Sequence, residues 1–230
     1  MLFYLTEPAA LLGIALAFII GVYARDAAQV GAARLVRDPT PARSGRLRAG
    51  LGRRVSPFSW VAVLIAGVGW AEPVPMNDVW RKRRFHVSAA LLAGPLAYLL
   101  LTVAALGGFR ALADRAVITG GNRGVEIGAV SGFALSLLLW MAITFGMMFI
   151  LSLVPVPPTD GGRILFLLGP QSPGWRNVNY RLTESNLGVV ILLAILLLPR
   201  LLPSLVPSIT GQLIGPLLVG LGGLVGLDLG

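Results

Sequence analysis

The stretch Ser152-Leu-Val-Pro-Val-Pro-Pro-Thr-Asp-Gly-Gly-Arg-Ile164 follows an apolar run that carries no charge from Ile127 onward. Proline lacks a backbone N–H and disfavours helical geometry in the residue before it, so the three prolines predict that the chain leaves a helix here and runs extended. The Gly-Gly pair then predicts a turn beside Asp160. The Asp160 carboxylate either caps the next helical segment or is held at a membrane boundary to meet a side chain from another helix.

The composition indicates an integral membrane protein. Of the 230 residues, 56% are hydrophobic and 13% are charged, whereas about a quarter are charged in ordinary soluble domains. Long uncharged stretches would aggregate in water, but a bilayer requires them. The chain has no cysteine, which excludes disulfides and thiolate metal sites, and it has one histidine, His86.

The positive charge is concentrated in two short segments. Seven of the 19 Lys and Arg residues lie in residues 34–54 and four in 81–84, as the positive-inside rule predicts for loops that flank apolar spans. Such loops also suit anionic headgroups, so we expect membrane lipids as partners and no nucleic acid. The basic residues expected to set topology or contact lipid are Arg43, Arg46, Arg48, Arg53, Arg54, Arg81, Lys82, Arg83 and Arg84.

The apolar runs predict an all-α membrane protein with about five transmembrane helices. The expected spans are residues 8–24, with helix continuing to about 35, then 87–106, 127–154, 187–206 and 209–229. The apolar run that begins at Pro57 is too short for a hydrocarbon core of about 30 Å. Residues 57–80 are therefore expected to form a re-entrant or interfacial segment covered by protein.

The same pattern predicts the topology. If residues 57–80 do not cross, both basic segments lie on one side, which the positive-inside rule makes cytoplasmic. Residues 107–126 are then an external loop of mixed charge, and the C-terminus is inside if both final runs span. No linker marks a second domain, so residues 1–230 are expected to be a single polytopic membrane domain, with a core at 8–165 and C-terminal helices at 187–229.

Three separated segments resemble motifs of site-2-protease-like intramembrane metallopeptidases. Gly69-Trp-Ala-Glu-Pro-Val-Pro-Met-Asn77 resembles their Gly-Trp-Ala-Lys-Pro-Val-Pro-Val-Asn segment. Leu91-Leu-Ala-Gly-Pro-Leu-Ala97 resembles their Ala-Gly-Pro helix, and Ser152 to Arg163 resembles their Asn-x-x-Pro-x-Pro-Pro-x-Asp-Gly-Gly motif. None of the three is specific alone, but their order agrees with the family, and the resemblance implies its core fold.

The resemblance also implies where a zinc site would lie. In the family, His-Glu-x-x-His on the first core helix supplies two zinc ligands and an acid that polarises water, and the Asp-Gly motif supplies the third ligand. The matching residues here are Arg25-Asp26-Ala27-Ala28-Gln29, and Asp160 matches the third ligand. Both histidines are absent, so we expect no zinc and no catalysis. Ser152 replaces the family's asparagine.

Arg25 then has two possible roles. Its guanidinium could occupy the place of the metal and pair with Asp160, and also with Asp26, because lone charges are costly within a membrane. Alternatively, Arg25 extends to the cytoplasmic headgroups. His86 lies beside the second basic segment, where a lone interfacial histidine is more often solvated than a ligand.

These observations favour a catalytically inactive site-2-protease-like protein. We expect it to bind, scaffold or assist other subunits of a membrane assembly, with a partner transmembrane helix or a lipid in the former substrate groove. The alternatives are an active intramembrane metalloprotease with unorthodox ligands and a small transporter or channel that uses the intramembrane charges. The family resemblance implies a bacterial plasma membrane.

Overall fold

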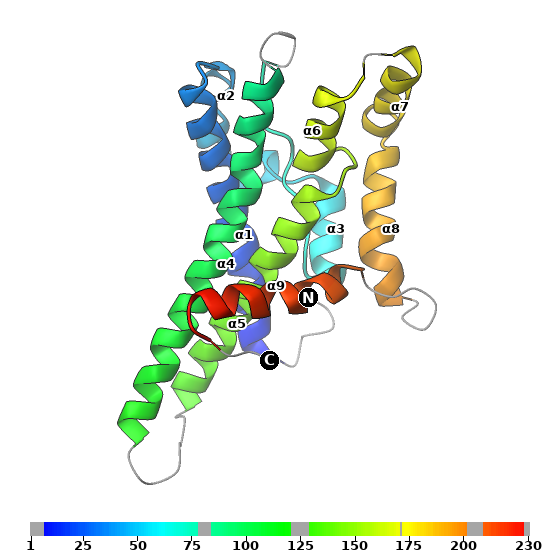
Figure 1. Ribbon diagram of the computed structural model, residues 1–230. Coiled ribbons are helices and arrows are strands. Elements are labelled where there is room, and N and C mark those ends of the chain that lie inside the picture. The colour runs from blue at the N-terminus through cyan, green and yellow to red at the C-terminus, as the bar shows by residue number, and fades with distance from the viewer. Residues whose placement is uncertain (1–6, 78–83, 121–128, 171, 202–208, 228–230) are drawn as a thin grey trace.

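The computed structural model describes residues 7–77, 84–120, 129–170, 172–201 and 209–227 (Figure 1). Within these ranges every regular element is a helix. The three helices long and apolar enough to cross a membrane are α1 (Pro8–Leu35), α4 (Arg84–Gly120) and α5 (Ala129–Leu153). The pair α7 (Pro173–Thr183) and α8 (Leu187–Leu201), bent by 62°, adds a fourth if it counts as one span.

The described part of the chain therefore has three to four candidate spans, where the sequence predicted about five. Residues 202–206 of the fourth predicted span lie outside the described residues. The remaining elements are short: α2 (Thr40–Arg43), the 3-10 turns η2 (Arg46–Arg48) and η3 (Leu51–Arg53), α3 (Pro57–Ala66), α6 (Asp160–Leu168) and α9 (Ile209–Leu224).

Helices α1, α4 and α5 pack against one another and form the centre of the molecule (Figure 1). Small residues on α1 permit this close approach. A Cβ atom at Gly13 would lie 2.8 Å from Trp140 Cβ on α5. Beside this contact, Phe18 of α1 packs edge-on against Trp60 of α3, with the ring centroids 5.6 Å apart.

Helix α3 is short because the chain turns back at its end. Ser56 caps its start, and Gly67 ends it with φ of +79°, a conformation that favours glycine. The chain then returns in extended form, and the Ser59 hydroxyl binds both the N–H and the carbonyl of Trp70, at 2.9 and 2.7 Å. The prediction that this apolar run is too short to cross as a helix is confirmed.

Helix α4 is longer than predicted. Residues 107–120, which the sequence analysis assigned to a loop, continue the helix to Gly120. The charges in this region are compatible with a helix because they pair along it: Arg110 and Asp114 lie one turn apart, with Nε and Oδ2 separated by 3.5 Å. The loop prediction relied on loss of apolar character, which does not by itself end a helix.

The proline-rich stretch ends α5 at Leu153, as the three prolines predicted. The predicted Gly-Gly turn is wrong, because α6 begins at Asp160 and includes both glycines. Thr159, not Asp160, caps α6 by accepting a hydrogen bond from the Gly162 N–H at 3.2 Å. A Cβ atom at Gly161 would overlap the backbone of Leu153, so the fold requires a glycine there for packing.

Helix α9 does not cross the bundle in the way the sequence analysis expected. It lies across α4 and α5 (Figure 1). Arg110 donates a hydrogen bond to the Val225 carbonyl at 2.6 Å, and Arg110 lies about 39 Å along α4 from Arg84, at a rise of about 1.5 Å per residue. The end of α9 is therefore far from the end of the molecule where α2, α6, α7 and the start of α4 lie together (Figure 1).

Candidate functional site

Arg25 and Asp160 form a buried ion pair between α1 and the start of α6. Arg25 Nε donates to Asp160 Oδ2 at 2.8 Å, and Nη2 donates to Oδ1 at 2.5 Å. The residues are 2% and 1% exposed. Planar guanidinium and carboxylate groups match at two points, which gives both strength and a fixed geometry. Arg25 is therefore directed inward and does not extend to headgroups.

Asp26 lies beside this pair and accepts hydrogen bonds from three arginines. Arg25 Nη1 contacts its Oδ1 at 3.1 Å, while Arg46 Nε and Arg54 Nη1 contact Oδ2 at 2.7 and 2.6 Å. Asp26 is fully buried, and Arg46 and Arg54 are 8% and 1% exposed. Arg46 and Arg54 therefore do not contact lipid, because both side chains pair with a buried carboxylate, while their part in setting the topology stays a prediction.

Segment 40–54 covers this charge cluster from the end of the bundle. The other N–H groups of its two buried arginines donate to backbone carbonyls. Arg46 donates to the carbonyls of Arg53 and Glu72, and Arg54 donates to those of Leu47 and Ala49, at 2.7 to 3.0 Å. The Arg54 guanidinium also lies 4.1 Å from the ring centroid of Tyr23. These contacts partly compensate the cost of burying three guanidiniums and two carboxylates in one cluster.

Gln29, at the second lost histidine position, hydrogen-bonds to the backbone of α4. Its Nε2 donates to the Leu91 carbonyl at 2.9 Å. In a regular helix that carbonyl would accept from the N–H four residues on, but this residue is Pro95, which has none. Gln29 therefore supplies the missing donor and links α1 to the proline site of α4. The sequence analysis missed this role, which the spacing of Leu91 and Pro95 could have indicated.

Gly94 brings α4 into direct contact with the charge cluster. A Cβ atom there would lie 2.5 Å from Gln29 Nε2, 2.9 Å from Asp160 Oδ2 and 3.0 Å from Arg25 Cγ. The Ala-Gly-Pro segment thus contributes to the site in two ways. Gly94 has no side chain, which lets α4 approach the cluster, and Pro95 has no N–H, which leaves the Leu91 carbonyl to Gln29. All three motif segments quoted above meet here, since Glu72 O accepts from Arg25 Nη1 at 3.2 Å.

A cavity of about 10 Å³ lies beside the pair, lined by Arg25, Trp70, Tyr98, Ser152 and Asp160 among others. This volume is close to the minimum for one water molecule. The buried Trp70 Nε1 has no hydrogen-bond partner among the described residues. The Ser152 hydroxyl donates to the Phe149 carbonyl at 2.7 Å within α5. The space between the helices therefore admits at most about one water.

The donor set at this site does not fit zinc. Arg25 carries a permanent positive charge and has no lone pair to donate. Both oxygens of Asp160 accept hydrogen bonds from Arg25, and Gln29 directs its amide nitrogen to Leu91. Among the described residues, no group of three His, Cys, Asp or Glu side chains could hold a metal ion. His86 is exposed and lies eight residues before Gly94, about 12 Å along α4.

The remaining basic residues of the sequence analysis lie at the surface or outside the described residues. Arg43, Arg48, Arg53 and Arg84 are exposed. Arg81, Lys82 and Arg83 lie outside the described ranges.

Comparison with curated proteins shows that the chain belongs to a family of zinc metalloproteases, in agreement with its resemblance to site-2-protease-like enzymes. The similar protein is "Putative zinc metalloprotease YwhC" of Bacillus subtilis (strain 168), which is 30% identical over 162 residues. The match covers 69% of this chain and 68% of that protein. No protein-family model matches the chain, and no solved structure matches it.

Proposed function

We propose that this chain is a catalytically inactive member of its metalloprotease family that binds no zinc. The observation that supports this most directly is the two-point contact of Arg25 with Asp160, at 2.5 and 2.8 Å. Arg25 stands at a position where the family places a histidine ligand, and it occupies the one ligand that this chain retains.

Electrostatics makes the arginine and a metal ion incompatible at this place. Two like unit charges 4 Å apart repel by about 4 kcal/mol at an effective dielectric constant of about 20, and a divalent ion doubles that value. Arg25 is buried and cannot lose its proton, so zinc would have to displace it from Asp160. An Arg25–Asp160 pair and a zinc ion at Asp160 therefore exclude each other.

The acid that would polarise water is also engaged. Both oxygens of the Asp26 carboxylate accept hydrogen bonds from arginine side chains, three guanidiniums in all. The adjoining cavity of about 10 Å³ leaves no room for a peptide bond. Both features support the proposal that no peptide bond is hydrolysed at this centre.

We propose that the chain acts as a binding, scaffolding or accessory subunit of a membrane assembly in a bacterial plasma membrane, with segment 34–54 and residues 81–84 on the cytoplasmic side. A groove of about 400 Å³ next to the site provides a place for a partner helix or a lipid. Its lining includes Val74, Val87, Leu91, Pro157 and Phe166. The lining also includes the polar residues Arg163, Asn179 and Thr183, so the groove offers a partner both apolar burial and hydrogen bonds.

The alternative of an active metalloprotease is favoured by one observation, the 30% identity to a relative named as one. No comparable observation favours a transporter, because the buried charges at this site pair with one another.

Elemental analysis of the purified protein tests the proposal. We expect far less than one zinc per chain in protein purified without chelator and dialysed against micromolar zinc. About one zinc per chain that is lost in an Asp160→Asn variant would overturn it. A His86→Gln variant, altered at the exposed histidine, controls for zinc bound at the surface.

A further inference from the structure

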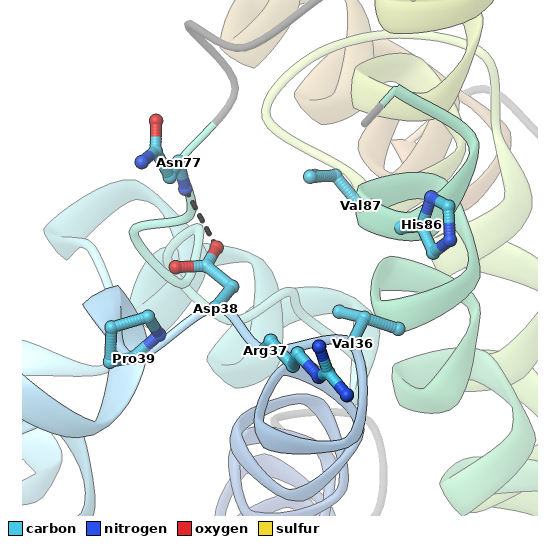
Figure 2. Close-up of a pocket in the computed structure, with 7 residues that line it drawn as sticks. All are labelled: Val36, Arg37, Asp38, Pro39, Asn77, His86 and Val87. Atoms are coloured by element: carbon cyan, nitrogen blue, oxygen red, sulfur yellow. Dashed lines mark hydrogen bonds between the residues drawn. The ribbon is translucent and has the colours of Figure 1, made fainter. Parts of the chain in front are cut away.

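A second pocket lies between the end of α1 and the start of α4, separate from the cavity at Arg25. Its volume is about 270 Å³. Figure 2 shows the lining residues: Val36, Arg37, Asp38, Pro39, Asn77, His86 and Val87. Three segments of the chain thus converge here, at the end of the molecule that carries α2 (Figure 1).

Asp38 joins two of these segments through backbone hydrogen bonds. Its Oδ1 accepts from the Thr40 N–H and its Oδ2 from the Asn77 N–H, both at 2.9 Å. Asp38 is 7% exposed. It is the acidic residue of the lining, and its carboxylate is directed at backbone N–H groups (Figure 2).

The exposed polar residues of the described lining carry N–H donors: Arg37 is cationic, and His86 and Asn77 add ring and amide N–H groups. Arg37 and His86 are exposed and belong to the lining. Two more exposed arginines, Arg34 and Arg84, lie within three residues of them in the chain. This set suits a singly charged phosphate group, which a guanidinium binds with several N–H donors at once.

Large apolar side chains stand beside the cationic ones. Leu35 is 86% exposed and Phe85 is 65% exposed, and they are the sequence neighbours of the lining residues Val36 and His86. Exposed apolar side chains next to arginines at the end of membrane-spanning helices are typical of the interface between headgroups and acyl chains.

We propose that this pocket binds the headgroup of an anionic phospholipid, with its phosphate at Arg37 and His86 and its acyl chains along Leu35 and Phe85. This inference does not depend on the state of the Arg25–Asp160 site. A zwitterionic lipid fits less well, because the described lining residues offer no exposed carboxylate to pair with a choline group.

Thermal unfolding in detergent, followed by tryptophan fluorescence, tests the proposal. We expect added phosphatidylglycerol to raise the unfolding temperature of the wild type more than phosphatidylcholine with the same acyl chains. Arg37→Gln should reduce that difference by at least half, while Arg48→Gln, which removes the same charge from an exposed site outside the pocket, should retain it. If Arg37→Gln does not fold, His86→Gln carries the same expectation.

Three outcomes would overturn the proposal. The first is an equal rise in unfolding temperature with the two lipids. The second is an equal loss of the phosphatidylglycerol effect in Arg48→Gln and Arg37→Gln. The third is the same rise in unfolding temperature with millimolar inorganic phosphate alone. The last outcome would identify a site for small anions instead of a lipid. Native mass spectrometry provides an independent readout, since the wild type should retain phosphatidylglycerol that Arg37→Gln loses.

Discussion

The guanidinium of Arg25 and the carboxylate of Asp160 are 135 positions apart in the chain and meet at 2.5 and 2.8 Å. The pair joins α1 to the start of α6 at the position where the family's motifs would place a metal. A metal centre ties helices together as well as supporting catalysis. Here an ion pair makes the cross-helix connection, and the described residues around it include no group of three metal-binding side chains.

Removal of Arg25 should destabilise the protein strongly. Arg25→Ala leaves Asp160 as an uncompensated buried charge, and breaking one side of a buried pair costs about 3–5 kcal/mol. Thermal unfolding in detergent measures the effect, with Arg48→Ala as the exposed control. An unfolding temperature equal to that of the wild type would show that the pair contributes nothing.

The two arginines of segment 40–54 should matter far more than their exposed neighbours. Arg46→Gln and Arg54→Gln each remove a charged hydrogen bond to fully buried Asp26, which contributes about 1.5–3 kcal/mol. Arg43→Gln and Arg53→Gln remove the same charge from exposed positions and should change stability by about 0.5 kcal/mol or less. Similar losses in all four variants would mean that net charge, not burial, governs the segment.

Gly94 and Gly107 lie on the same helix and provide a matched pair. Gly94→Ala places a methyl group against Gln29, Asp160 and Arg25 and should destabilise the protein by about 1–3 kcal/mol. Gly107 has nothing within 4 Å of the added Cβ, so Gly107→Ala should be neutral or slightly stabilising. Proteolysis rates in detergent would rank the two. Equal tolerance would mean that α4 does not approach the cluster this closely.

The bond from Gln29 to the Leu91 carbonyl predicts a specific coupling with Pro95. Gln29→Leu should cost about 1–3 kcal/mol, because the carbonyl is left without a donor. In a Pro95→Ala background the helix regains its own N–H, so the same substitution should cost clearly less. A double-mutant cycle on unfolding free energies measures the difference. Strict additivity would contradict the role assigned to Gln29.

Parts of this fold could be predicted because they follow from local chemistry. Pro155 and its neighbours end α5, and the run from Pro57 is too short to cross. The extension of α4 to Gly120 was missed because the loss of apolar character does not by itself end a helix. The sequence pattern also did not indicate that Gly161 lies inside α6 and packs against the backbone of Leu153.

The site shows the same division between what residue types reveal and what only the fold reveals. The residues Arg25, Asp26, Gln29 and Asp160 were all identified from the motifs. The burial of Arg46 and Arg54 was not, because a basic loop has the same composition whether its arginines face lipid or a carboxylate. The distinction depends on long-range packing of segment 40–54 over Asp26.

If Arg25 occupies the place of the metal, replacing Arg25 and Gln29 by histidines should create a zinc site. Zinc would be measured in the double variant Arg25→His/Gln29→His, beside the wild type and a triple variant that adds Asp160→Asn. We expect about one zinc per chain in the double variant alone. Zinc in the wild type, or no gain in a correctly folded double variant, would contradict it.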